Sequence, residues 1–208
     1  MTKAPRRTVT REQVLHAAIE LLDRDGVEGL SMANLASHIG FTTMAVYRHV
    51  ENRDDLIDGV VRIVLRDVVE QVPTDVDWLD GVVAWMDHVR RCLQAHPWAA
   101  RMLGTASGPF PPWREALGPL RRHFVASPLS TRDQARAYAW VSRLTIGIMI
   151  LELGAPAGEG SRRRRASRAK SLDPDEALLD EHSRVTNDDV FADAVRHTRT
   201  YLASLAGC

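Results

Sequence analysis

The chain has 208 residues, 45% of them hydrophobic, so it can bury a substantial core and its composition argues against intrinsic disorder. Its 27 basic and 27 acidic residues cancel, so the whole-chain charge gives no sign of a nucleic-acid partner and such evidence must be local. The two cysteines, Cys92 and Cys208, form neither a disulfide framework nor a zinc spacing, and no apolar run reaches the roughly 18 residues that span a bilayer. We expect a cytoplasmic protein with no membrane contact.

The N-terminal segment predicts three short helices. Apolar residues recur on one helical face over residues 10–25, and Gly26 supplies a stop. Ser31 can cap a shorter helix that ends at Gly40, and Thr42 can cap the next helix after a tight turn. Three short helices with a glycine turn between the last two are typical of a helix-turn-helix.

Two capping boxes mark helix starts in this part of the chain. Thr10 and Gln13 form the first, and Asn52 and Asp55 form the second. From the second box we expect one long helix over residues 52–72, because its apolar residues recur on one side until a proline ends the pattern.

The rest of the chain carries the apolar stripes of a larger helical unit, interrupted by a glycine- and proline-rich loop at residues 104–112. A low-complexity basic stretch, residues 154–172, is interpreted as a flexible linker. The sequence shows no alternating strand pattern and no internal repeat, so the predicted fold class is all-α. Helices are expected over residues 78–93, from Pro97, and over residues 113–126, 131–153 and 188–205.

The helix expected over residues 131–153 is apolar almost all round in its later part. Such a helix must be covered on every side, and a chain of this size has few helices left to cover it. A partner subunit is the economical explanation.

The short segment at residues 42–49 has two different faces. With successive residues about 100° apart, Val46 and Val50 point one way, while Met44 and Arg48 point the other way. A helix of about two turns is marginal alone, so the two valines must dock on the first two helices. The outer face is then free to enter a DNA major groove, which admits one α-helix.

A solvated helix face is the alternative interpretation of this outer surface. Residues 1–71 hold nine Lys or Arg and eleven Asp or Glu, so this part of the chain is not basic overall. The nucleic-acid interpretation therefore depends on placement, and Lys3, Arg6, Arg7 and Arg11 place positive charge just before the first helix.

Residues 17–60 read AAIELLDRDGVEGLSMANLASHIGFTTMAVYRHVENRDDLIDGV and contain LASHIG, AVYRHV and NRDDL in order. With these segments at their characteristic positions and spacing, the chain resembles the TetR family of one-component transcriptional regulators. The resemblance implies a helix-turn-helix at residues 31–49, with the recognition helix at 42–49. It also implies an N-terminal DNA-binding domain, residues 1–55, and a larger C-terminal helical bundle for ligand binding and dimerisation, residues 56–208.

In that family the residues matching Tyr47, His49 and Arg53 commonly hold phosphates, while the outward residues of the recognition helix lie nearest the bases. Met44 and Ala45 are apolar where some relatives have polar residues that contact bases. We therefore expect contacts with thymine methyl groups and recognition of DNA shape to matter more than bidentate hydrogen bonds. The predicted DNA-binding residues are Ser31, Thr42, Thr43, Met44, Ala45, Tyr47, Arg48, His49 and Arg53.

The resemblance further implies dimerisation through the last two long helices and a pocket for a small hydrophobic ligand inside the bundle. Ordinary helix packing is the better explanation of any single candidate residue, but the set offers a large, adaptable apolar surface. The predicted ligand-binding residues are Trp85, Met86, Val89, Cys92, His96, Met102, Trp113, Phe124, Trp140 and Leu144. His88, His96 and His123 form no i, i+4 pair, so no metal and no cofactor is predicted.

These features predict a homodimeric DNA-binding transcriptional regulator, a repressor of a pseudo-palindromic operator that a small hydrophobic ligand releases. The alternative is a DNA-binding dimer whose C-terminal domain serves only dimerisation or protein contact. An enzyme is not expected, because G-x-S-x-G, Walker, dinucleotide, H-E-x-x-H and C-x-x-C patterns are absent. The basic run at residues 161–170 follows the predicted dimerisation helix, so we interpret it as a solvated linker, with a secondary contribution to DNA affinity as the alternative.

Overall fold

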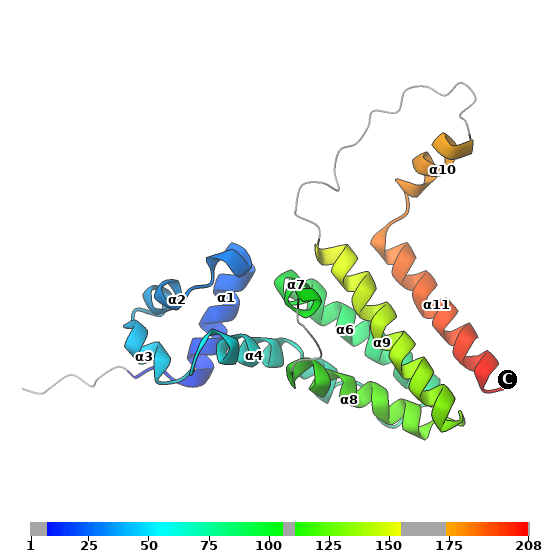
Figure 1. Ribbon diagram of the computed structural model, residues 1–208, viewed down its shortest axis with the longest axis horizontal. Helices are drawn as coiled ribbons and strands as arrows, with labels where there is room; N and C mark the ends of the chain where they lie inside the picture. Colours follow the sequence, from blue (N-terminus) through cyan, green and yellow to red (C-terminus); the bar gives the residue numbers. More distant parts are fainter. Residues whose placement is uncertain (1–7, 106–110, 155–173, 208) are drawn as a thin grey trace, which may run out of the picture.

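The structure is a computed structural model that describes residues 8–105, 111–154 and 174–207. These residues form α-helices and no strand, which confirms the predicted all-α fold, and none of their helices is long and apolar enough to cross a membrane. Figure 1 shows a small head of α1–α3 joined through α4 to a larger bundle. The helices are α1 (Arg11–Gly29), α2 (Met32–Ile39), α3 (Thr43–Tyr47), α4 (Arg53–Val64), α5 (Arg66–Glu70), α6 (Trp78–Ala95), α7 (Pro97–Thr105), α8 (Pro111–Ala126), α9 (Thr131–Gly154), α10 (Pro174–His182) and α11 (Asn187–Leu205).

Local capping residues set the ends of the head helices. Thr10 and Gln13 form the predicted capping box of α1, and Gly26, with a φ of 72°, interrupts that helix near its end. Ser31 caps α2, which ends at Gly40 with a φ of 70°. Because L-residues with side chains rarely adopt positive φ, these two glycines fix where the chain turns within the head.

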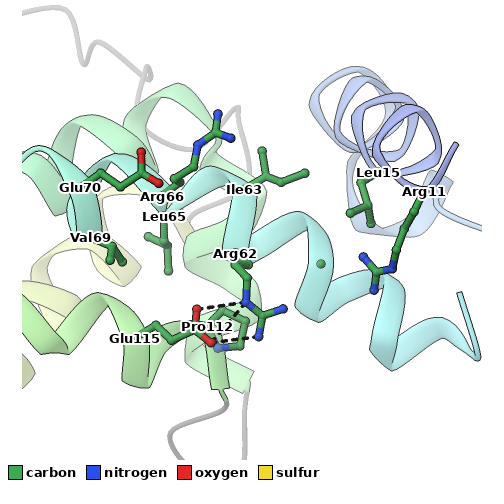
Figure 2. Close-up of a pocket in the computed structure, with 11 residues that line it drawn as sticks. Arg11, Leu15, Arg62, Ile63, Leu65, Arg66, Val69, Glu70, Pro112 and Glu115 are labelled. Carbon is green, nitrogen blue, oxygen red and sulfur yellow. Dashed lines mark hydrogen bonds and ion pairs between the residues drawn. The ribbon is translucent and has the colours of Figure 1, made fainter. Parts of the chain in front are cut away.

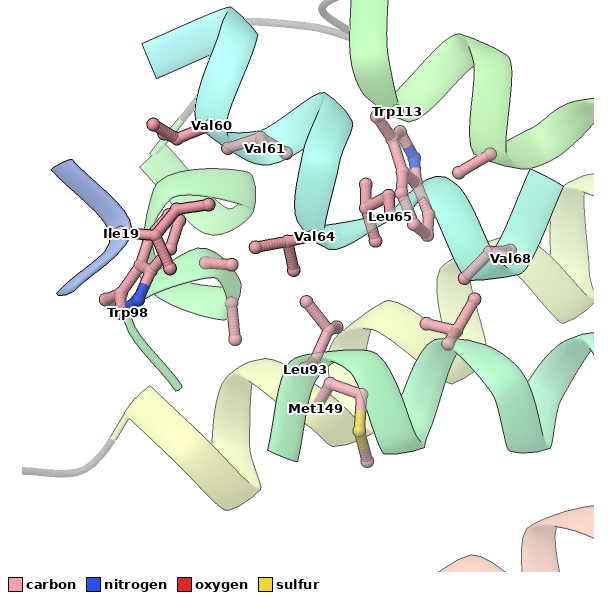
Figure 3. Packing of buried hydrophobic residues seen from close by; sticks show 14 of the residues in the cluster. Ile19, Val60, Val61, Val64, Leu65, Val68, Leu93, Trp98, Trp113 and Met149 are labelled. Carbon is pink, nitrogen blue, oxygen red and sulfur yellow. The ribbon is translucent and has the colours of Figure 1, made fainter. Parts of the chain in front are cut away.

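The prediction of one long helix over residues 52–72 is wrong. The chain forms α4, then leaves helical geometry at Leu65, which has a ψ of 3°, and then forms α5. The α4 helix packs against α1 and α8, whereas α5 packs against α6 and α8. Figure 3 shows Val64 and Val68 on either side of the break, both within the buried cluster, so the break lets two differently directed segments reach one core.

Half of the second predicted capping box is also wrong. The Asn52 side chain accepts a 2.9 Å hydrogen bond from the N–H of Asp55, as predicted. The Asp55 carboxylate instead accepts hydrogen bonds from the N–H of Glu51 at 3.0 Å and from the Arg11 guanidinium at 2.6 Å. The Asp55 carboxylate therefore bonds to Arg11 and Glu51 instead of closing the capping box. Its charge-assisted hydrogen bond with Arg11 links α1 to the start of α4.

The bundle has a continuous hydrophobic core. Trp85 and Phe124 are among its largest buried side chains, and Figure 3 shows Leu93 of α6 next to Met149 of α9. Pro97 is the first residue of α7, as the sequence predicts, because the first turn of a helix does not need its missing N–H.

The loop predicted at residues 104–112 is shorter in the structure. The α7 helix runs to Thr105 and α8 begins at Pro111, while residues 106–110 lie outside the described part of the chain. Because proline is tolerated in the first turn of a helix, the prolines that suggested a loop form the first residues of α8.

The last three helices differ in how well the sequence predicts them. The bounds of α9 and α11 follow the prediction closely, whereas α10 has no buried residue and no apolar stripe that would reveal it. Of the predicted linker at residues 154–172, Gly154 ends α9 and the rest lies outside the described residues. On α9, Trp140 and Leu151 are 38% and 81% exposed, so the described helices of this chain do not cover α9 on every side.

Candidate nucleic-acid interface

The α3 helix, Thr43–Tyr47, is shorter than the predicted recognition helix but has the predicted faces. Val46 and Val50 are buried in the hydrophobic core. Met44 and Tyr47 are 68% and 47% exposed. In Figure 1, α3 lies at the side of the head away from the bundle, so its outer face meets solvent.

The chain continues in a helical turn beyond α3. Arg48 is in the right-handed helical region, and the N–H of His49 donates a 2.9 Å hydrogen bond to the carbonyl of Val46. Arg48 and Arg53 are exposed, and neither forms an ion pair with a residue that the structure describes. Two uncompensated guanidinium groups therefore flank the turn that follows α3, where they can bind phosphate oxygens or a guanine edge.

Capping hydroxyls stand at the starts of both helices of the helix-turn-helix. Ser31 accepts a 3.1 Å hydrogen bond from the N–H of Asn34, and Thr42 accepts one of 3.3 Å from the N–H of Ala45. A hydroxyl that accepts a capping bond keeps its own proton, which can be donated to a phosphate. Both side chains are exposed, so capping and a backbone contact to DNA are compatible at these positions.

Arg11, the first residue of α1, contributes less positive charge to this surface than the sequence suggests. The Arg11 guanidinium binds the Asp55 carboxylate at 2.6 Å, so it braces α1 against α4. Lys3, Arg6 and Arg7 lie outside the described residues.

Most residues predicted for the ligand pocket pack into the bundle core. Trp85, Met86 and Val89 are fully buried, and Trp113 and Phe124 are nearly so. The indole N–H of Trp85 donates a 2.7 Å hydrogen bond to the carbonyl of Ala116, and its ring centroid lies 6.0 Å from that of Trp113. Within the described residues, none of these five side chains lines the cavity between head and bundle, the one beside α5 and α6, or the one on the outer side of α9.

The remaining predicted ligand residues separate between two surface cavities and the core. Cys92 and His96 line a cavity of about 360 Å³ beside α5 and α6, whereas Trp140 and Leu144 line one of about 560 Å³ on the outer side of α9. Met102 is half-buried and packs against the core. The structure does not gather the ten residues around one of these cavities, and their role in ligand binding stays a prediction.

The histidines of the bundle have separate partners. His88 Nδ1 lies 2.8 Å from the carbonyl of Ala84, and His96 Nδ1 lies 2.9 Å from the Asp23 carboxylate. His123 is buried, and desolvation lowers the pKa of its imidazole. No group of three or more metal-ligating side chains occurs within the described ranges.

One contact between head and bundle was not predicted from the sequence. The Asp23 carboxylate of α1 accepts a 2.7 Å hydrogen bond from the indole N–H of Trp98, besides its contact with His96. In the sequence, Asp23 is one more polar residue on the solvent side of an amphipathic helix, so no local signal distinguishes it.

The comparisons with known proteins agree with this geometry. Residues 14–60 match the family model described as bacterial regulatory proteins, tetR family. An HTH-type transcriptional regulator of Saccharopolyspora erythraea is 35% identical over 69% of this chain and 61% of its own length, so the chain spans less than two thirds of that protein. The tetracycline repressor protein class A of Escherichia coli is 30% identical over 78% of this chain and 73% of its own.

Solved structures show the same fold. Apo ActR from Streptomyces coelicolor aligns with a TM-score of 0.77 and 22% identity, over 98% of this chain and 99% of ActR. The complex of ActR with (S)-DNPA aligns with a TM-score of 0.74 and 21% identity, over 95% of this chain and 98% of that one.

The family match falls on the segment that builds the two-faced α3, and the similarity to the tetracycline repressor extends over most of both chains. The relatives are regulators of transcription, and their family consists of DNA-binding proteins rather than enzymes. The chain therefore belongs to the TetR family of bacterial transcriptional regulators.

Proposed function

We propose that this protein is a homodimeric, cytoplasmic transcriptional repressor that binds a pseudo-palindromic operator. In this proposal residues 1–55 form the DNA-binding domain and residues 56–208 form the dimerisation and regulatory domain. Two heads related by a two-fold axis read major-groove segments about one helical turn, roughly 34 to 36 Å, apart. The observation that carries the proposal is the exposed outer face of α3 above a buried docking face.

The side chains of that face suit a major groove. Arg48 has no carboxylate partner in the described residues, and a bidentate bond from arginine to guanine contributes about 1–3 kcal/mol of discrimination against the wrong base. Met44 offers an apolar contact to a thymine methyl group, and the Tyr47 hydroxyl suits a phosphate.

The outer side of α9 and α11 supports the proposed dimer. Trp140 stacks obliquely on Tyr201 of α11 with ring centroids 5.0 Å apart, yet remains partly exposed. Leu151 and Val190 also expose large apolar side chains along these two helices. A second copy that covers this surface around a two-fold axis removes it from water.

Control by a small hydrophobic ligand is the finer part of the proposal. It draws support from similar proteins, which include a tetracycline repressor and ActR, whose structure has been solved in complex with (S)-DNPA. A ligand that tilts α4 changes the spacing of the two heads, and both can then no longer seat in successive grooves.

A DNA-binding dimer without a ligand is the second candidate. It is favoured by the complete burial of Trp85, Met86 and Val89, which fill the position predicted for the pocket. A thermal-shift screen against apolar compounds separates the two candidates, because a ligand that binds only the folded state raises its melting temperature.

The experiment that tests DNA binding begins with selection of bound fragments from genomic DNA, followed by titration of the recovered duplex. Arg48→Ala and Tyr47→Ala are compared with Arg132→Ala. This control removes an exposed arginine from α9, which belongs to the bundle and not to the head. We expect the first two variants to lose about tenfold in affinity while the control binds as wild type, and loss of a phosphate contact lowers the salt slope by about one. Wild-type affinity in both recognition-helix variants contradicts the proposed interface.

A further inference from the structure

A third cavity, of about 330 Å³, lies where the head meets the bundle. In Figure 2, Arg11 and Leu15 reach it from α1, Pro112 and Glu115 reach it from α8, and α4 and α5 form the wall between them. None of the ten residues predicted for the ligand pocket lines this cavity. It is therefore a different site from the one implied by the family resemblance.

Close contact between α1 and α4 makes both helices part of the same cavity wall. A Cβ atom at Gly59 would lie 2.6 Å from Leu15 Cδ2 and 3.3 Å from a terminal nitrogen of Arg11. The absence of a side chain at Gly59 is what lets α1 lie this close to α4. A molecule in the cavity thus touches the head and the connecting helix at once.

Positive charge predominates among the lining side chains. The guanidinium groups of Arg11, Arg62 and Arg66 stand against the carboxylates of Glu70 and Glu115. Arg62 donates to the two carboxylate oxygens of Glu115 at 3.0 Å from Nε and 3.0 Å from a terminal nitrogen (Figure 2), and this contact lowers the pKa of the Glu115 carboxyl. Glu115 is therefore committed to one of the three arginines.

Arg66 differs from the other two arginines of the cavity. Its side chain forms no ion pair or hydrogen bond with any residue in the described part of the chain, whereas Arg11 is bound to Asp55. Glu70, one turn later on α5, is likewise unpaired among those residues. The cavity thus offers one uncommitted guanidinium, that of Arg66, because Arg11 is neutralised by Asp55 and Arg62 by Glu115, and the exposed carboxylate of Glu70 can turn away into solvent.

The rest of the wall is apolar. Leu15, Ile63, Leu65, Val69 and Pro112 line the cavity between the charged groups. A volume near 330 Å³ is at the lower end of the range for small-molecule sites, about 300–1,000 Å³. This size and lining suit a compact apolar body with a single charged group.

We propose that this cavity binds a small organic anion, a carboxylate on an apolar body. Arg66 holds the carboxylate, for which a guanidinium is geometrically suited, and Ile63 and Val69 cover the apolar body. Because the bound molecule touches α1, α4 and α8 together, its affinity depends on how the head is oriented on the bundle. The site is therefore coupled to operator binding, and this last step rests on the proposed function.

Direct binding is tested on the full chain with 2-naphthoate as the probe and uncharged 2-naphthamide as its matched control. Isothermal titration at constant ionic strength is expected to show one site per chain for the acid and at least about tenfold weaker binding of the amide, because a charge-assisted hydrogen bond contributes about 1.5–3 kcal/mol. Equal affinity for acid and amide overturns the proposal.

Matched arginine variants locate the site. Arg66→Gln is expected to weaken 2-naphthoate binding by about tenfold, while Arg132→Gln, which removes an exposed arginine far along the chain, leaves it unchanged. Val69→Asp places a like charge in the wall at a partly exposed position and is expected to weaken binding as well. Binding that both cavity variants leave intact shows that the acid is bound elsewhere and overturns the assignment.

Coupling has its own readout. Saturating 2-naphthoate is expected to change the dissociation constant of the selected operator duplex, and the duplex must change that of the acid by the same factor. Acid binding that depends on Arg66 but leaves operator affinity unaltered contradicts the coupling. If no duplex is bound at all while the acid still binds through Arg66, the proposed function fails and the anion site stands.

Discussion

The carboxylate of Asp23 accepts a 2.7 Å hydrogen bond from the indole N–H of Trp98, although the two residues belong to the first and the seventh helix. The ring of Trp98 is buried, and Figure 3 places it next to Ile19 of α1. His96 Nδ1 lies 2.9 Å from the same carboxylate. One side chain of the head therefore holds two side chains at the start of α7.

Replacing Asp23 by alanine is expected to lower the free energy of unfolding by about 1–3 kcal/mol, because it leaves the buried indole N–H of Trp98 without its acceptor. Urea denaturation measures the loss. Asp25→Ala is the matched control, since among the described residues Asp25 forms an ion pair only with the exposed Arg24 beside it, and a change within about 0.5 kcal/mol is expected there. Equal losses at both positions would show that the hydrogen bond between Asp23 and Trp98 adds no stability beyond that of an exposed ion pair.

Gly81→Ala is expected to destabilise the bundle by about 1–3 kcal/mol through overpacking. A Cβ atom at Gly81 would lie 2.2 Å from the imidazole of His123, and burial leaves that ring little room to move. A double-mutant cycle with His123→Ala provides the control, because removal of the ring should relieve the clash and make the two effects strongly non-additive. Additive losses in thermal or urea unfolding would contradict this explanation.

Stability is expected to fall as the pH is lowered through the ordinary pKa of histidine, about 6.5. Burial lowers the pKa of His123 in the folded chain, although a hydrogen bond with the Pro73 backbone opposes this, so the unfolded chain takes up the proton first. The unfolded state then binds more protons between the ordinary pKa and the lowered folded value, and the free energy of unfolding decreases across that window.

Denaturant titrations at about pH 7.5 and about pH 5.5 measure this loss. His123→Phe keeps a ring but has no titrating group, so its stability should depend less on pH even if it is lower at both values. His182→Gln, at an exposed position of α10, is expected to retain the wild-type pH dependence. An unchanged slope in His123→Phe would assign the pH effect to other groups.

Leu151→Glu is expected to shift the proposed dimer toward monomer in sedimentation-velocity experiments. Leu151 is 81% exposed on α9, so a glutamate costs the isolated chain little, but an apolar contact between two α9 helices would bury two unpaired charges. Val125→Glu changes a residue of similar exposure, 69%, on α8 and is expected to leave the oligomeric state unchanged. A fully dimeric Leu151→Glu protein would exclude this end of α9 from the interface.

Features with a local cause were predictable from the sequence. Thr10, Ser31 and Thr42 cap the helices that the sequence assigns to them, because a side-chain oxygen and the N–H groups two or three residues later are sufficient for a cap. Gly26 and Gly40 turn the chain where a positive φ is needed. The inward valines and outward Met44 and Tyr47 followed from helical periodicity alone.

Features that depend on distant partners were not predictable in this way. The break at Leu65 arises because the segments on its two sides pack against different helices. Asp55 does not complete the predicted capping box because its carboxylate binds Arg11, which lies 44 residues away in the chain. Periodicity likewise marked Trp85 and Met86 as apolar, but only packing shows that they fill the core instead of lining an open cavity.

The sequence by itself determined the three-helix head, the two faces of α3 and the all-α class, because caps, glycine turns and helical periodicity act over a few residues. Only the tertiary structure decided how the head is fixed to the bundle, through Asp23 and Trp98, and where a cavity remains between them. Such contacts depend on side chains that meet after the helices have packed, and a polar residue on a helix surface carries no mark of the partner it will find.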